Sequence, residues 1–104
     1  MAVTSKVLAR TAAATSSTTL YTSPNTSTTA VVTNIVISNT ATSQSTATVS
    51  MDGVVIVPTI KVDANSVVGF DIKQVLPANN PAKTITGYAS TTAVNFHISG
   101  VEIV

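Results

Sequence analysis

The residues best suited to chemistry are one histidine and four carboxylates in a chain of 104 residues. Histidine titrates near neutral pH, so His97 is the natural candidate for a general base. Serine is abundant, but a Ser-His-Asp triad is recognised by geometry, and no Gly-x-Ser-x-Gly turn marks a nucleophile. His97 alternates with Phe96 and Ile98, which places it on the opposite face of a strand. We therefore interpret His97 as a surface or interface residue and expect no catalytic residue.

The four acids are Asp52, Asp63, Asp71 and Glu102, and their spacing is not that of metal ligands. Two of them have simpler roles, because Asp52 and Asp63 lie in turn sequences. The chain has no cysteine, and its four glycines are isolated from one another, so no phosphate-binding loop is indicated. We expect no metal site and no cofactor, and we predict that the protein is not an enzyme.

Charge and aromatic content argue against two classes of partner. The net charge is only +1, far from the basic patch of a nucleic-acid-binding domain. The four aromatic residues are too few for a stacking platform on single strands or sugars. No stretch approaches 18 apolar residues, so no transmembrane helix is predicted. The sequence predicts neither nucleic acid nor membrane as a partner.

The N-terminal segment holds the candidate partner-binding residues Lys6, Val7 and Arg10. Residues 1–14 form either an N-terminal arm or a first strand, and residues 15–104 form the main domain. On a regular strand Lys6 and Arg10 would share one face. One hypothesis is that this basic segment contacts an acidic partner, and the alternative is a solvated terminus.

The elements that must position these residues are β-strands, because Val, Ile and Thr dominate the composition. Thr29–Asn39 is the strongest strand, and Ser45–Met51 alternates between apolar and polar residues. Asp52-Gly53 follows directly and predicts a tight hairpin with positive φ at both residues. Pro58 then indicates an edge strand or a bulge within Val54–Val62.

The second half of the chain continues the strand pattern. Val67–Val75 alternates, with Val68, Phe70 and Ile72 on the inner face. The last strand, Ala93–Val104, changes phase: Val94, Phe96 and Ile98 share one parity, and Val101 and Ile103 have the other. We predict a β-bulge at Gly100 that restores the register.

Short strands separated by turn sequences, with no long helical period, are typical of a sandwich or barrel. The sequence predicts an all-β fold, a single antiparallel β-sandwich of about seven or eight strands. Its connectivity is either Ig-like or jelly-roll-like, and the pattern does not separate the two.

Two parts of the chain have a distinctive pattern. Thr19–Pro24 (TLYTSP) leads into Thr28–Thr40 (TTAVVTNIVISNT) and then through a Ser/Thr-rich bridge to Ala47–Val49. The ending is Val94–Val104 (VNFHISGVEIV). These segments resemble small structural proteins of tailed bacteriophage virions. Together these segments cover about two fifths of the chain.

The resemblance implies a β-sandwich subunit located in the virion and assembled in the bacterial cytoplasm. The role it implies first is a capsid decoration or cement protein, with the major capsid protein and other virion subunits as partners. It also implies a homo-oligomer, such as a trimer. The alternative is a tail, neck or fibre component that binds a receptor or a glycan.

Overall fold

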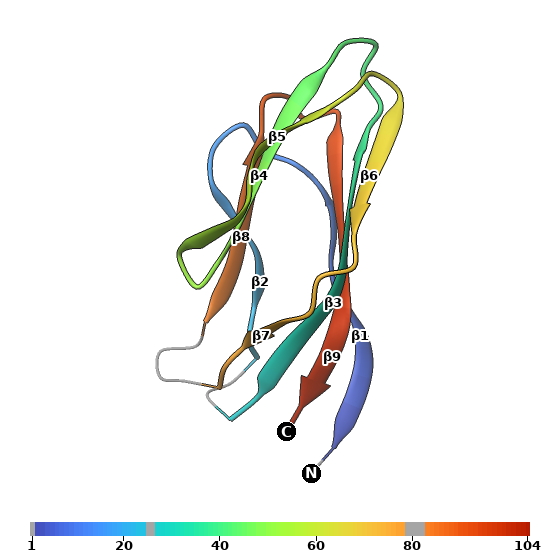
Figure 1. Cartoon of the computed structure of the whole chain (residues 1–104). Coiled ribbons are helices and arrows are strands. Elements are labelled where there is room, and N and C mark those ends of the chain that lie inside the picture. Colours follow the sequence, from blue (N-terminus) through green and yellow to red (C-terminus); the bar gives the residue numbers. More distant parts are fainter. Residues whose placement is uncertain (1, 25–26, 79–82) are drawn as a thin grey trace.

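The computed structural model describes residues 2–24, 27–78 and 83–104. In these residues the chain forms strands and no helix, and the two ends of the chain lie together at one end of an elongated molecule (Figure 1). The strands are β1 (Val3–Ala12), β2 (Thr18–Thr22), β3 (Thr29–Asn39), β4 (Ser45–Met51), β5 (Val54–Val62), β6 (Ser66–Phe70), β7 (Gln74–Leu76), β8 (Thr84–Ala89) and β9 (Val94–Ile103).

The strands form two antiparallel sheets that pack face to face, which confirms the predicted β-sandwich. Sheet A has the order β1-β9-β3-β6, and the short β7 also pairs with β3. Sheet B has the order β2-β8-β4-β5. The antiparallel pairs are nested along the chain, as in one long hairpin rolled around a core. From the outermost to the innermost, they are β1 with β9, β2 with β8, β3 with β6 and β7, and β4 with β5. This is the connectivity of a jelly roll rather than that of an Ig domain.

The core lies between the sheets and consists of aliphatic side chains around one phenylalanine. Alternate residues of β3, β4 and β9 point into it, because successive side chains of a strand face opposite sides of its sheet. Its largest fully buried apolar residues are Phe96, Ile35, Ile37, Leu76, Ile85, Ile98, Val32, Val49, Val57, Val62 and Val94.

The turn predictions at the β4–β5 hairpin are confirmed. Asp52 and Gly53 have φ of 54° and 77°, the left-handed values that a two-residue hairpin turn needs. β5 is an edge strand of sheet B. Its register against β4 shifts beside Pro58, and Thr59 has a φ of 45°. The proline therefore lies at both an edge and an irregularity.

The predicted strand Val67–Val75 is interrupted in the structure. β6 ends at Phe70, and β7 begins at Gln74, with both pairing to successive parts of β3. The inward positions are confirmed, because Val68, Phe70 and Ile72 pack half-buried against the core. The sequence also predicts a turn at Ser23–Asn25 and a loop at Pro77–Pro81, because both are rich in proline and asparagine. Both segments lie partly outside the described residues.

The predicted bulge at Gly100 is wrong. β9 alternates between buried and half-buried residues without interruption from Val94 to Ile103. The extra residues lie on both neighbouring strands instead, at Leu8 of β1 and Thr33 of β3. The change of phase in the apolar pattern arises because Glu102 occupies an inward position while aliphatic residues occupy outward ones.

The N-terminal segment is the first strand and not a free arm. β1 pairs with β9 along its whole length, and Ala2 and Val104 exchange two backbone hydrogen bonds beyond the ends of these strands. Leu8, Ala9 and Ala13 belong to the buried core. Residues 3–12 are therefore an integral edge of the sandwich.

Candidate partner-binding surface

The bulge at Leu8 separates the two basic residues of β1, which a regular strand would place on one face. Lys6 lies opposite the buried Gly100, so its side chain starts from the inner side of sheet A. Arg10 lies opposite His97, which is on the outer side. The expectation that Lys6 and Arg10 share a face is wrong, because one inserted residue reverses the alternation.

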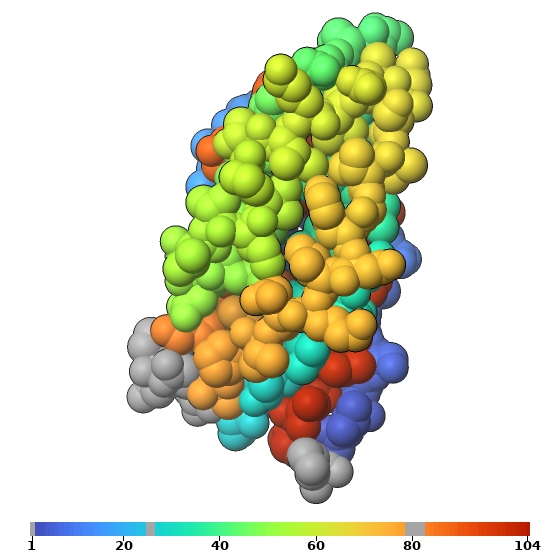
Figure 2. All heavy atoms as spheres, viewed as in Figure 1, coloured from blue at the N-terminus to red at the C-terminus, as the bar shows by residue number. Residues whose placement is uncertain are grey.

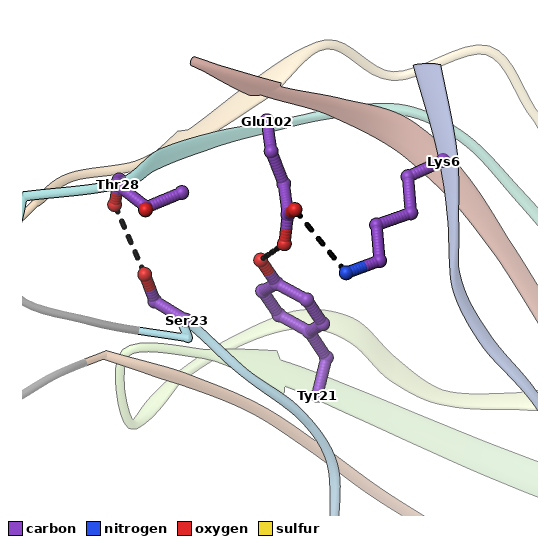
Figure 3. A network of polar contacts seen from close by, with 5 residues as sticks. All are labelled: Lys6, Tyr21, Ser23, Thr28 and Glu102. Carbon is purple, nitrogen blue, oxygen red and sulfur yellow. Dashed lines mark hydrogen bonds and ion pairs between the residues drawn. The ribbon is translucent and has the colours of Figure 1, made fainter. Parts of the chain in front are cut away.

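Lys6 contacts a carboxylate between the sheets rather than solvent alone (Figure 3). Its Nζ donates a hydrogen bond to Glu102 Oε1 at 3.2 Å. The Tyr21 hydroxyl donates to Glu102 Oε2 at 2.5 Å. Lys6 comes from β1, Glu102 from β9 and Tyr21 from β2, so the three side chains join sheet A to sheet B.

The surroundings of this carboxylate favour its charged form. The hydrogen bond from Tyr21 lowers the pKa of Glu102, burial opposes this effect, and the ammonium group of Lys6 lowers the pKa further. Burial, followed by the bond to Glu102 and its negative charge, raises the pKa of Tyr21. The arrangement is therefore an ionised carboxylate held by a neutral phenol and a cation, with both of its oxygens engaged.

Sequence reasoning missed this network, and the signal for it was the change of phase in β9. Glu102 is flanked by Val101 and Ile103, whose outward positions leave the inward position to the charged residue. The usual rule that apolar residues mark the inner face therefore fails at this end of β9. A glutamate between two outward aliphatic residues of a central strand is better explained by inward partners than by solvent.

The outer face of sheet A is apolar near the chain termini. The strand register places Val3 beside Ile103, and places Val101 and Val31 in one row with Val75. Val3, Val7 and Val75 are 63%, 45% and 60% exposed. The other outward residues of these rows are Ser5, Ser99, Thr29 and Asn34, which are polar but uncharged. We call this surface the apolar face; it consists of Val3, Val7, Val31, Val75, Val101 and Ile103.

Beyond the bulges the same outer face becomes basic and polar. Arg10, His97 and Val36 form one row across β1, β9 and β3. We call Arg10 and His97 the basic end of the outer face. Of the three candidate partner-binding residues, Val7 lies on the apolar face, Arg10 lies at the basic end, and Lys6 is turned toward Glu102. The structure therefore brings Val7 and Arg10 together on one surface and separates Lys6 from them.

A shallow hollow lies at the end of the sandwich farthest from the termini. It has a volume of about 360 Å³ and is lined by Ser38, Asn39, Thr40, Asn65, Ser66 and Val67. Its lining has no titratable side chain, and the Asn39 amide is already bonded to the backbone carbonyls of Ser43, Val62 and Asp63. The hollow offers little specific chemistry to a ligand.

The described part of the chain has neither a metal-binding cluster nor a membrane-spanning helix. In residues 2–24, 27–78 and 83–104, no group of three or more His, Cys, Asp or Glu could hold a metal ion. The same part of the chain contains no helix long and apolar enough to cross a membrane.

Comparisons with protein-family models, curated proteins and solved structures found no match to this chain. The function is therefore inferred from the surface described above and from the resemblance in the sequence.

Proposed function

We propose that this chain is a structural subunit of a phage virion that binds the major capsid protein and stabilises its lattice. The observation that supports this proposal is the apolar face on the outside of sheet A. Exposed apolar surface that is continuous across neighbouring strands favours a protein partner. A decoration subunit needs such a surface on a rigid body, and it needs no reacting group.

The charged residues also favour a structural role over an enzymatic one. Glu102 is bound by Tyr21 and Lys6, and Asp52 forms an ion pair with Lys83 at 3.1 Å. A catalytic carboxylate needs at least one oxygen directed at a substrate. Both oxygens of Glu102 are bonded within the protein, so this carboxylate, the one buried acid of the described residues, is not directed at a substrate.

Two buried polar clusters support the rigidity that this role requires. Glu102 bonds across the sandwich near the end of β9, and Asn39 bonds from β3 to the Val62 carbonyl of β5 near the beginning of β9. Both clusters link sheet A to sheet B, at opposite ends of β9. A sandwich tied at both ends keeps its outer face in one shape, which lowers the ordering cost of binding.

The test is the copy number of the chain in purified particles, measured by quantitative mass spectrometry against the major capsid protein. We expect a ratio of order one, as for a subunit that covers the capsid lattice. Absence from the particles would refute the proposal. The homo-oligomer, including the trimer that the resemblance implies, stays a prediction, and sedimentation velocity of the purified chain tests it.

The alternative is a tail, neck or fibre subunit that binds a receptor or a glycan, and it predicts only a few copies per particle. The positions of the aromatic residues give glycan binding little support. Tyr21 is buried and bonded to Glu102, Phe96 is in the core, and Tyr88 is the one aromatic residue that is exposed, at 38%. A single exposed ring is a weak platform for a sugar.

A further inference from the structure

Strand β5 forms a free edge whose sequence is well suited to pairing with another chain. In the part of the chain that the structure describes, β5 pairs only with β4, so its other side is open. Val54–Val57 is a run of four β-branched residues, and Val54 and Val55 are 70% and 53% exposed. Figure 2 shows β5 at the surface, beside β6 on one side of the molecule. A regular, apolar edge strand of this kind is a template for edge-to-edge association.

Charge gives this edge little protection against such association. The net charge of the chain is +1, and Lys61 is the one charged residue of β5. Copies of a chain with so little net charge repel one another only weakly. Protection of the edge must therefore come mainly from the shape of its backbone.

The backbone of β5 is irregular at two places. Nine residues of β5 lie opposite seven residues of β4, because the register shifts once at Ile56 and once at Pro58–Thr59. Extra residues of this kind bend a strand and interrupt its ladder of hydrogen bonds. Pro58 also lacks an amide hydrogen, so it cannot donate a bond to a neighbouring strand. A second chain would meet no continuous, straight row of backbone groups along this edge.

The second of these bulges includes a residue in an unfavourable conformation. Thr59 has a φ of 45°, a left-handed value that β-branched residues rarely adopt. Its hydroxyl is 3.0 Å from the hydroxyl of Thr48 on β4, and this hydrogen bond holds the bulge against the neighbouring strand. Thr59 is exposed, so packing in the core does not explain its conformation. A strained residue persists where its surroundings fix it, and here the strain maintains the irregular edge.

We propose that the two bulges of β5, together with Pro58, keep the free edge of sheet B from pairing with β5 of a second copy. Without them, a seven-residue strand would match β4 residue for residue. Its open side could then pair antiparallel with the same strand of another copy about a two-fold axis. A homo-oligomer of this chain therefore uses a contact other than the edge of β5. The protection acts on the free chain, so it does not depend on the virion role.

The test makes the strand regular and measures association. Deletion of Ile56 and Pro58 together places Thr59 opposite Thr48, leaves seven residues on each strand, and keeps the remaining inward residues inward. Pro58→Thr restores the amide hydrogen alone and adds no apolar side chain. Thr59→Gly is the matched control, because glycine adopts a φ of 45° readily and both bulges remain.

Three measurements are made on the wild type and on each variant. Sedimentation velocity at the same micromolar concentrations gives the fraction of protein in species heavier than those of the wild type. Hydrogen exchange followed by mass spectrometry shows whether β5 forms the contact, because newly paired amides exchange more slowly. Urea unfolding shows that the variant is folded.

We expect the double deletion to raise the associated fraction at least tenfold, with slower exchange in β5, and Pro58→Thr to raise it at least twofold. Thr59→Gly should associate no more than the wild type. Folded variants that also associate no more than the wild type would overturn the proposal, as would association without slower exchange in β5. If the double deletion does not fold, Pro58→Thr decides by the same criteria. Absence of the chain from purified particles would refute the proposed function and leave this result unchanged.

Discussion

Gly100 is the position where one added methyl group should destabilise the protein most. A Cβ atom there would lie 2.2 Å from the Val31 carbonyl oxygen and 2.9 Å from Leu8 Cδ1. Ordinary carbon–oxygen contacts are about 3.3–3.6 Å, so β9 and β3 would have to separate locally by roughly 1 Å. Overpacking costs about 1–3 kcal/mol where side chains can move. Because backbone must move here, we expect Gly100→Ala to cost about 3 kcal/mol or more.

Two other strand glycines provide a graded control for this reasoning. At Gly69 the nearest atom to an added Cβ is Val36 Cγ2 at 3.8 Å, an ordinary contact. Gly69→Ala should therefore be neutral or stabilise by about 0.5 kcal/mol, since alanine loses less backbone freedom on folding. At Gly87 the Cβ would meet Leu20 Cδ1 at 2.9 Å and the Thr48 carbonyl oxygen at 3.1 Å. Because the leucine side chain can move, we expect an intermediate cost of about 1 kcal/mol for Gly87→Ala.

Urea unfolding followed by circular dichroism measures the three free energies. With an m-value of about 1–2 kcal/mol/M, a loss of 3 kcal/mol lowers the midpoint by about 1.5–3 M. The same contact predicts that Gly100→Val is much more destabilising than Ser99→Val, whose side chain lies on the outer face. If Gly100→Ala and Gly69→Ala unfold at the same urea concentration, the close approach of Val31 to β9 is wrong.

Three further predictions concern polar groups and the hairpin. Because the folded pKa of Glu102 lies below its ordinary value of 4.5, the unfolded chain takes up the proton first as the pH falls. The free energy of unfolding should therefore decrease below about pH 4.5, and Glu102→Gln should reduce this pH dependence. The same change of unfolding free energy with pH in both proteins, measured by urea melts at several pH values, would contradict this prediction. Asn39→Ala should cost about 2–4 kcal/mol, because it removes an amide that makes several buried backbone bonds; a midpoint close to wild type would show that these bonds contribute little. Gly53→Ala should cost about 1 kcal/mol in the same melts, because its φ of 77° is unfavourable for alanine, and Gly69→Ala is its control.

The fold was predictable where local chemistry and the hydrophobic pattern agree. Asp52-Gly53 specifies a two-residue hairpin because few other pairs tolerate positive φ twice. Pro58 excludes a central strand because it lacks an amide hydrogen. The wrapped strand order was not predictable, since it depends on which distant strands pair, and alternation alone contains no information about partners.

The surface was predictable in composition but not in arrangement. Residue type and position near the N-terminus indicate Val7 and Arg10 as partner-binding residues, and both lie on the outer face. A regular strand would place Lys6 on the same face as Arg10. The inserted residue Leu8 turns Lys6 inward. No residue type in β1 predicts this insertion, because leucine is also common in regular strands. The bulge follows from the close fit of three strands around Gly100, which is a tertiary property.

The end of β9 links the fold to the proposed binding surface. An isolated sandwich would be more stable with aliphatic residues inside and the carboxylate in water, because burying a charge costs free energy even when it is paired. Here Glu102 is inside, and Val101 and Ile103 lie outside. This inverted pattern is unfavourable for a free monomer but becomes favourable once a partner covers the outer face. The hydrogen bond between Tyr21 and Glu102 lies directly behind the apolar face. It therefore helps to fix the shape of the sheet at the proposed contact. On this argument, Glu102→Leu combined with Lys6→Leu and Tyr21→Phe, which removes all three polar partners together, should leave the folded chain as stable as the wild type or more so. Val101→Thr should weaken binding to particles with little change in the urea midpoint. Loss of folding in the triple variant would contradict the argument about the inverted pattern, and unchanged binding by Val101→Thr would contradict the proposed contact.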